Sequence, residues 1–446
     1  MSGPARAPAG TLNGRAAIPR ATSTARLLPV GAGSSWADHL ARLGPLPAAV
    51  TDAAGHLAQV LHASGLMGRG GAGFPTGRKV SSVAAAVLRS RTPAVVLANC
   101  CEGDPTSLKD RVLIERSPQL VIDGALHAAA AVDADRVVLA VHEHAPAKAQ
   151  LLAALADRPD PGCEVTVVGV PSRYVASEAT ALVRYLNTGD ARPAGKMVPI
   201  WETGVNGRPT LVDNAETLAQ LALIARFGPA WFGSVGTVAE PGTSLVTIGG
   251  AVPRAGVVEV AHGTPLRAVL ARAGAVPAGW ALIGGLAGRW VELPAFAEIG
   301  YSTGELAAAG GTRGVGSIIV LPPGGCVLTE TVRILRFHAN AGARQCGPCM
   351  FGLPAIAADM AALAGGDRGA LDRLRRRLPV IDGRGACGHP DGAVAVAASA
   401  LSVLTGRDSA HLAQHRRARG CRPPPPVVPL GAAELSPRSL STGVRS

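Results

Sequence analysis

The chain of 446 residues has few aromatic side chains and no long apolar segment. Phe, Trp and Tyr together make up only 3% of its residues. No apolar run reaches the roughly 18–20 residues that a membrane-spanning helix needs, and residues 1–27 lack the apolar centre of a secretory signal. The sequence therefore predicts a protein without a membrane span. We expect it in the cytoplasm, either free or held peripherally at the inner face of the membrane by a partner.

Cysteine spacing and charge argue against two further classes of protein. The eight cysteines lack the even spacing of a disulfide-bonded scaffold. The net charge of +12 is large, but the basic clusters at 373–377 and 416–419 contain no aromatic residue. Surfaces that bind nucleic acids usually combine both kinds of side chain. We therefore expect no nucleic-acid partner, and an acidic protein is at least as good a candidate for docking at these clusters.

The first half of the chain alternates between short apolar runs and helical patterns. The runs at 94–99, 136–141 and 165–169 suit buried strands, and the segments at 120–132 and 145–155 have apolar residues at helical spacing. This alternation predicts an α/β domain with a parallel sheet. We expect five segments: a disordered tail at 1–27, the α/β domain at 28–235, a small mixed sheet with one helix at 240–325, a helical domain at 326–408, and a second disordered tail at 409–446.

A glycine-rich segment follows a predicted helix at 50–66. Residues 68–79 read GRGGAGFPTGRK and contain one G-x-G-x-x-G. A dinucleotide-binding fingerprint follows a strand, so this match alone is also compatible with a surface loop. However, the glycines let backbone N–H groups approach a ligand, Arg69 and Lys79 supply charge for a phosphate, and Phe74 offers a flat face for stacking. This combination favours a nucleotide or flavin site.

Polar residues follow the predicted strands, where a parallel sheet binds its ligands. Asn99 and Glu102 come after the first predicted strand, and Tyr174 and Glu178 come after the third. Asn214 precedes a helical segment and could be only its N-cap. We expect these side chains to lie at the same edge of the sheet.

Three cysteines near the C-terminus have the spacing of a metal or cluster site. Cys346 and Cys349 form a C-x-x-C, and Cys387 follows about forty residues later. In a cytoplasmic protein this spacing favours a metal or an iron–sulfur cluster over a disulfide. A redox-active thiol pair and a zinc site completed by His389 are the alternatives.

Taken in order, these segments resemble one family: the NADH- and FMN-binding flavoprotein subunit of respiratory complex I (the F subunit of NADH-quinone oxidoreductase) and related soluble diaphorase subunits. The family pattern GRGGAGFPTG-x-K stands intact at 68–79, and its Asn-x-x-Glu turn and Lys-Asp-Arg stand at 99–102 and 109–111. The resemblance covers roughly residues 50–405. It implies an α/β fold class with a Rossmann-like FMN-binding domain, a small ubiquitin-like β-grasp domain and a C-terminal helical-bundle iron–sulfur domain.

By position, the resemblance implies cofactor-binding roles for particular residues. Phe74 falls on an aromatic residue that stacks on the dinucleotide, and Lys196 falls on a basic residue near the NADH. No side chain is implied as a general acid or base. The flavin-binding positions fall on Gly68, Gly70, Gly71, Lys79, Asn99, Glu102, Tyr174, Glu178, Asn214 and Thr217, and Arg69 lies among them.

The sequence departs from the family at three positions near these residues. A second acidic residue, which lies next to the NADH in the family, is Ala179 here. A second stacking aromatic residue is replaced by Ser82, and the Asp expected before Glu102 is Cys101. The departures leave the expectation of FMN binding in place and predict weaker binding of NADH.

The family binds one [4Fe–4S] cluster through four cysteines, of which this chain has three. These are Cys346, Cys349 and Cys387, whereas the first family cysteine falls on Ala343. A residue other than cysteine could complete the ligand set. The candidates are Gln345, His389 and Cys326.

The resemblance implies electron transfer as the function. A hydride would pass from NADH to a non-covalent FMN, and electrons would leave through the cluster to a protein subunit or a quinone-linked acceptor. One alternative keeps both cofactors but takes electrons from a ferredoxin or another flavoprotein in place of NADH. Another is a non-catalytic paralogue that serves as a binding or assembly subunit.

Overall fold

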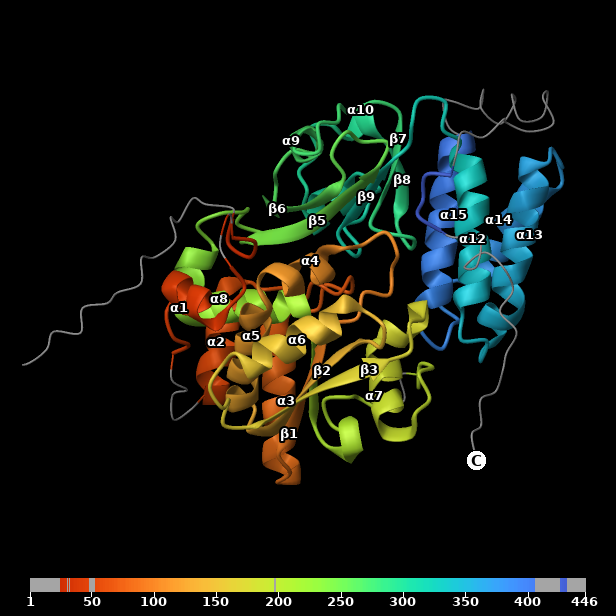
Figure 1. Ribbon diagram of the computed structural model, residues 1–446. Helices are drawn as coiled ribbons and strands as arrows, with labels where there is room; N and C mark the ends of the chain where they lie inside the picture. The colour runs from red at the N-terminus through yellow and green to blue at the C-terminus, as the bar shows by residue number, and fades with distance from the viewer. Residues whose placement is uncertain are drawn as a thin grey trace, which may run out of the picture.

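The structure, a computed structural model, describes residues 25–29, 31, 33–47, 53–195, 198–405 and 426–430. A parallel α/β unit, a small mixed sheet and a helical bundle follow one another along the chain, and the mixed sheet lies between the other two in sequence (Figure 1). This arrangement confirms the predicted α/β fold class with a helical C-terminal region. No helix in the described ranges is long and apolar enough to span a membrane.

The first sheet has the order β3-β2-β1-β4, and all of its neighbouring strands are parallel. The sequence predicted its first three strands but not β4, because the polar end of that short strand resembles a helix cap. The chain passes from β1 to β2 and β3 on one side and then returns to the other side of β1 for β4. The topological switch point, where such sheets bind ligands, therefore lies between β1 and β4. The strands are β1 (Ala94–Asn99), β2 (Ala134–His142), β3 (Glu164–Val170) and β4 (Thr210–Asn214).

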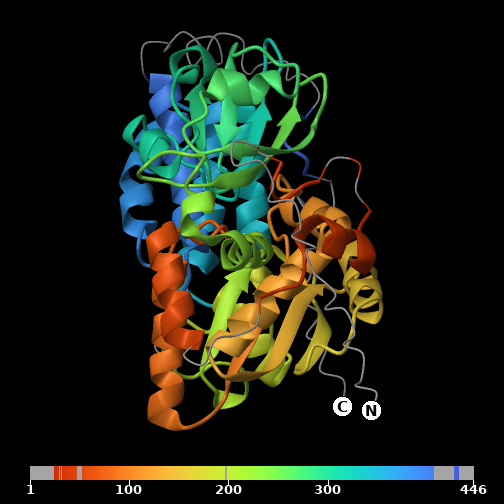
Figure 2. The same cartoon turned by 90° about the vertical axis from the view of Figure 1, so that its left-hand side faces the viewer.

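Helices cover both faces of this sheet (Figure 2). The segment α5 is apolar on nearly all sides, and 11 of its 14 residues are buried. It packs closely on α8, because a Cβ atom at Gly124 would overlap the backbone of Leu218. The helices of this unit are α1 (Trp36–Leu43), α2 (Ala53–Ser64), α3 (Thr76–Ser90), α4 (Lys109–Arg116), α5 (Pro118–Ala131), α6 (Pro146–Ala156), η1 (Tyr174–Ser177), α7 (Ala179–Thr188), η2 (Val205–Gly207) and α8 (Ala215–Phe232).

The second sheet is mixed, with the order β6-β5-β9-β7-β8. The neighbouring strands β5 and β9 are parallel, the other pairs are antiparallel, and α9 follows the first hairpin. This is the strand order of a β-grasp sheet. Its elements are β5 (Thr243–Gly250), β6 (Gly256–Ala261), α9 (Leu266–Ala271), β7 (Trp280–Ile283), β8 (Arg289–Glu292), α10 (Leu293–Phe296), α11 (Thr303–Ala308) and β9 (Ser317–Val320).

In the described part of the chain, four helices form the C-terminal bundle around a shared apolar core. A turn of π-helix, η3, precedes the second of them and carries one cysteine of the C-x-x-C. On its side facing the first sheet the bundle approaches η1, since the ring of Tyr174 lies 5.4 Å from that of Phe337. The helices are α12 (Val327–Ala341), η3 (Pro348–Gly352), α13 (Leu353–Ala364), α14 (Ala370–Ile381) and α15 (His389–Thr405).

Short pieces of both predicted tails are packed on the fold, which differs from the expected disorder. Near the N-terminus, Leu27 is fully buried and the backbone N–H groups of residues 26–28 donate to the carboxylate of Glu259. Near the C-terminus, Val428 and Leu430 are buried against the bundle, and their carbonyl oxygens accept from Arg333. Apolar side chains within these tails find a core surface that composition alone does not reveal. The remaining tail residues lie outside the described ranges.

Candidate functional site

A cavity of about 440 Å³ opens at the carboxyl edge of the first sheet. Its walls come from all three parts of the protein, because the loops after β1, β3 and β4 meet the β-grasp unit and the start of α15 there. The lining residues are Arg69–Ala72, Asn99, Cys101–Asp104, Ser107, Lys109, Asp110, Tyr174, Val175, Ser177, Glu178, Asn214, Ala287, Val315 and Cys387–His389.

The glycine loop forms one wall of this cavity. The Gly68 N–H donates to the Phe74 carbonyl oxygen at 2.9 Å and closes the loop at its base. The Arg69 N–H donates to the side chain of Thr217 at 2.9 Å, which ties the loop to α8. The loop opens α3, a helix that the sequence pattern did not predict, but α2 rather than a strand precedes it. The loop therefore leads into a helix, as in the usual dinucleotide fingerprint, but it follows a helix instead of a strand.

Gly70 lies where a side chain would enter the cavity. A Cβ atom at this position would lie 3.6 Å from Asn214 Cβ, an ordinary contact, and would meet no other protein atom within 4 Å. The backbone here is not in the left-handed region, so strain does not select glycine. The absence of a side chain leaves space open on the cavity side and lets a ligand approach the backbone.

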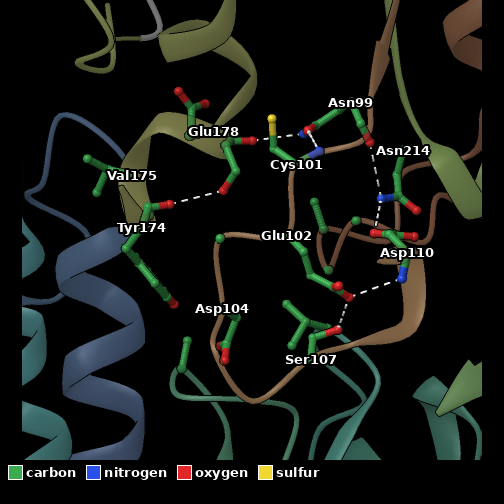
Figure 3. Close-up of a pocket in the computed structure, with 18 of the residues that line it drawn as sticks. Asn99, Cys101, Glu102, Asp104, Ser107, Asp110, Tyr174, Val175, Glu178 and Asn214 are labelled. Atoms are coloured by element: carbon green, nitrogen blue, oxygen red, sulfur yellow. Dashed lines mark hydrogen bonds between the residues drawn. The ribbon is translucent and has the colours of Figure 1, made fainter. Parts of the chain in front are cut away.

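The turn after β1 forms a second wall, drawn in Figure 3. Asn99 donates to the Ser177 carbonyl oxygen at 2.8 Å and accepts from the Cys101 N–H at 3.1 Å. Glu102 accepts from the Ser107 hydroxyl at 2.7 Å and from the Asp110 N–H at 3.0 Å. These bonds hold the polar side chains of the turn in one orientation before any ligand arrives.

Burial, together with the charge of Asp110, raises the pKa of Glu102 to about 7. We expect this shift to make flavin-free protein less stable as the pH rises from about 4.5 to about 7. In this window the unfolded chain has lost the proton while the folded protein retains it, so the free energy of unfolding falls with rising pH. Glu102→Gln cannot ionise and should remove this part of the decline. Melting temperatures of both flavin-free proteins across the window test this, and a difference independent of pH would contradict the raised pKa.

A buried ionic cluster forms part of the cavity wall. Lys109 Nζ lies 2.8 Å from Asp110 Oδ1 and 3.0 Å from Glu216 Oε2, and it donates to Asn214 Oδ1 at 3.1 Å. Burial alone would lower the pKa of Lys109, but the charges of Asp110 and Glu216 outweigh it and raise the pKa. The lysine thus remains charged and fixes the carboxylates and the amide around it.

Asn214 and Glu178 both line the cavity and cap helices. Asn99 and Asn214 are direct register partners at the ends of β1 and β4, so the switch point brings them together. Asn214 accepts from the Glu216 N–H at 3.0 Å as the N-cap of α8, while its Nδ2 donates to Asp110 Oδ2 at 2.7 Å. Glu178 Oε2 accepts from the Thr180 N–H at 2.9 Å as the N-cap of α7. The cap that the sequence suggested for Asn214 is therefore present beside its place in the cavity.

The structure brings eight of the predicted cofactor-binding residues to the cavity and leaves the others outside its lining. Lys79 is paired with Asp213, whose Oδ1 lies 2.7 Å from its Nζ. Phe74 is 40% exposed, and the Arg78 guanidinium lies 5.6 Å from its ring centroid. Gly68 and Thr217 hold the glycine loop in place through the hydrogen bonds given above. Lys196 lies outside the described residues. The eight that line the cavity are Arg69, Gly70, Gly71, Asn99, Glu102, Tyr174, Glu178 and Asn214.

The three C-terminal cysteines lie between the ends of the bundle helices. Cys349 is buried in η3, and its Sγ accepts from the Arg344 N–H at 3.3 Å. Burial raises the pKa of the Cys387 thiol, and the thiols of Cys349 and Cys346 are near enough to add to the shift. Cys387 also lines the cavity. In the described part of the chain, no three His, Cys, Asp or Glu side chains converge on a point that would suit a single metal ion.

Sequence reasoning missed several residues of the cavity. Asp104 accepts from the Leu286 N–H at 2.8 Å and joins the β1 turn to the β-grasp unit. Lys109 and Asp110 were noted only as part of a motif, although the motif follows the Asn-x-x-Glu turn closely enough to suggest a common site. No local pattern pointed to Ala287 or Val315, which reach the cavity from loops of the second sheet.

Comparison with known proteins gives matches to both halves of this site. Residues 61–223 match the family described as the Nuo51 FMN-binding domain, and residues 330–406 match the NADH-ubiquinone oxidoreductase-F iron-sulfur binding region. The chain is similar to the second NADH-quinone oxidoreductase F subunit of Rhizobium meliloti (strain 1021), with 28% identity over 379 residues, 81% of this chain and 89% of that protein. It is similar to the NADH-quinone oxidoreductase F subunit of Rickettsia bellii (strain OSU 85-389), with 29% identity over 351 residues, 74% of this chain and 84% of that protein.

Two solved structures of an NAD+-reducing [NiFe]-hydrogenase share the fold, each with a TM-score of 0.72. The H2-reduced form is 26% identical and covers 83% of this chain, and the air-oxidized form is 27% identical and covers 86%. The present chain spans only 63% and 66% of the length of those hydrogenase chains. The matched regions coincide with the glycine loop and the cysteines around the cavity. The chain therefore belongs to the family of the flavoprotein F subunit of NADH-quinone oxidoreductase and related diaphorase subunits.

Proposed function

We propose that the protein transfers electrons from NADH through a bound FMN and one [4Fe–4S] cluster to a partner. One observation carries the proposal: a single cavity is lined by the glycine loop and by Cys387. A flavin in this cavity would lie beside a cluster held by the cysteines. FMN supplies the chemistry that accepts a hydride and releases single electrons. The residues of this chain bind and orient the cofactors and keep water from them.

The cavity suits a flavin in size and in the groups that line it. Its volume of about 440 Å³ lies within the range of cofactor sites. The backbone at Gly70 and Gly71 is free of side chains on one side, and Tyr174 offers a ring and a hydroxyl on another. Arg69 is buried, and its Nε atom has no hydrogen-bond partner. We assign flavin binding to the eight predicted residues that line the cavity, with Gly68, Lys79 and Thr217 in supporting positions and the dinucleotide contacts to Phe74 and Lys196.

The cysteine site suits a cluster of several irons. The backbone N–H of Arg344 already points at Cys349 Sγ, and the N–H of His389 donates to Cys387. Such N–H···S bonds stabilise thiolate ligands. Burial raises the pKa of Cys349 and of Cys387, so these two thiols stay protonated until iron binds and displaces the protons. We therefore assign Cys346, Cys349 and Cys387 as cluster ligands.

An absorbance spectrum of anaerobically purified protein, followed by NADH addition, tests the function. We expect flavin and iron–sulfur bands that bleach with NADH. The same bands without bleaching would contradict NADH as donor and favour a ferredoxin-type donor. A colourless protein that stays colourless with added FMN, iron and sulfide would favour a binding or assembly subunit.

The acceptor is, in this proposal, another protein subunit or a ferredoxin, through which electrons could reach a quinone. The similarity to subunits of larger assemblies supports partner subunits as such. A peripheral position on a membrane would follow from that partner. The test of a protein acceptor is co-purification of the tagged chain with the proteins encoded by adjacent genes. NADH should then reduce the co-purified protein.

Ala179→Glu is expected to strengthen NADH binding by about 10- to 100-fold. Ala179 is the first residue of α7, where a carboxylate is also favourable for the helix, so the variant should fold. A charged hydrogen bond contributes about 1.5–3 kcal/mol. Stopped-flow flavin reduction over a range of NADH concentrations measures the change, with Ala179→Gln as the uncharged control. Tight saturation by the unmodified protein would show that other residues replace the missing acid.

A further inference from the structure

A buried histidine lies beside the cysteines at the start of α15. The His389 side chain is only 8% exposed, and its ring centroid lies 5.0 Å from that of His338. Its Nε2 atom donates to the His338 carbonyl oxygen at 2.9 Å, which leaves the lone pair on Nδ1. The Nδ1 atom is buried and has no hydrogen-bond partner. A buried polar atom without a partner costs free energy, and binding a ligand would remove that cost. The lone pair of Nδ1 is therefore available for a bond to a metal.

His389 lies close to two of the three cysteines, to Cys349 through its ring and to Cys387 through its backbone N–H. A Cβ atom on Gly342 would overlap Cys349 Sγ and lie 3.4 Å from His389 Nε2, so the thiol and the ring flank the same point of the backbone. On the other side, the His389 backbone N–H donates to the thiol of Cys387, two residues earlier. His389 therefore belongs to the same small cluster of side chains as the cysteines.

The other two candidates for a fourth ligand are engaged elsewhere. Cys326 is the N-cap of α12, where its Sγ accepts from the Thr329 N–H at 3.3 Å. The 15 residues of α12 separate it by about 22 Å from the end of the helix that leads to the C-x-x-C. Gln345 donates its amide to the Pro193 carbonyl oxygen at 2.5 Å and is turned toward the loop after α7. Ala343, at the position of the missing family cysteine, has no side-chain atom that could bind iron.

We propose that His389 is the fourth ligand of the cluster and binds iron through Nδ1. The proposal rests on the proposed function, because it presupposes a cluster on the three cysteines. The bond from Nε2 to a backbone carbonyl is the usual support for a metal-bound histidine, since it fixes the tautomer and the ring. A neutral imidazole in place of a thiolate raises the reduction potential of a cluster. Electrons would therefore be held more firmly on this cluster than on one with four cysteines.

Pulsed electron paramagnetic resonance on the anaerobically reconstituted, reduced full-length protein tests the ligand. With 15N-labelled histidine, we expect one strongly coupled nitrogen in the wild type and its loss in His389→Leu. The control is His338→Gln, which changes the neighbouring buried ring, keeps an N–H donor toward the Leu286 carbonyl and should retain the coupled nitrogen. His389→Cys restores four thiolates and should shift the midpoint potential of the cluster downward in a redox titration.

The outcomes separate the ligand from the function on which it rests. A wild-type cluster without a coupled histidine nitrogen, or a coupling that persists in His389→Leu, would overturn the histidine ligand and leave the electron-transfer function standing. An unchanged potential in His389→Cys would also overturn it. Failure of the wild type to bind iron and sulfide at all would overturn both proposals.

Discussion

Replacing Gly70 with valine is expected to yield a folded protein that does not retain FMN. In the protein alone a Cβ atom at this position makes only one ordinary contact, 3.6 Å from Asn214 Cβ, so the added carbons extend into the cavity. Forcing such a group against a bound ligand costs about 1–3 kcal/mol, which weakens binding by roughly 10- to 100-fold. Flavin content after gel filtration and FMN titration of the flavin-free protein measure the effect.

Two further variants make this test specific. Gly304→Val places the same side chain on α11, where a Cβ atom would meet nothing within 4 Å, and should keep its flavin. Gly70→Ala adds one carbon and should have an intermediate affinity. Circular dichroism and iron content of Gly70→Val show whether the fold and the cluster survive. Normal flavin content in that variant would rule out the glycine loop as the flavin site.

Substitution of Cys349 by serine is expected to abolish the cluster and leave FMN in place. The thiol of Cys349 is buried within η3 and accepts a hydrogen bond from the Arg344 N–H. We therefore expect no other side chain to replace it as a ligand. Serine is a poor ligand for iron–sulfur clusters, which prefer thiolates. Loss of the broad visible absorbance and of bound iron and sulfide is the expected result, with the flavin bands unchanged.

Cys163→Ser is the matched control, because Cys163 is a half-buried cysteine just before β3, outside the cavity and the cysteine site. It should keep both cofactors. A full complement of iron and sulfide in Cys349→Ser would show that the cysteine assignment is wrong. Loss of FMN together with the cluster would show instead that the bundle, rather than the glycine loop, governs flavin binding.

Local patterns were sufficient to predict the main elements of the fold. Continuous apolar runs indicated the strands that became β1, β2 and β3. The inner strands β1 and β2 are largely buried and need no polar alternation, whereas the edge strand β3 is mostly half-buried. The intact glycine segment and the C-x-x-C indicated the two cofactor regions. Each of these motifs places several groups suited to binding a cofactor within a few residues of the sequence. The same reasoning failed for β4 and α3, where a short polar-ended strand and a helix behind a glycine loop carry weak periodic signals.

Contacts between distant residues depended on the tertiary structure. The pairing of Asn99 with Asn214 follows from the return of the chain to the free side of β1, which no local signal specifies. The ion pair of Lys109 with Glu216 depends on the same crossover.

The sequence by itself determined the family and the glycine loop, because the motifs that identify them consist of neighbouring residues, and it predicted Cys346, Cys349 and Cys387 as cluster ligands. It left Gln345, Cys326 and His389 equivalent as candidates for a fourth ligand. Only the fold separates them: α12 carries Cys326 away from the cysteine site, Pro193 engages Gln345, and the start of α15 brings His389 beside Cys349. The ligands of a cluster come from separate parts of the chain. The distances between them are fixed only when the helices that carry them have packed.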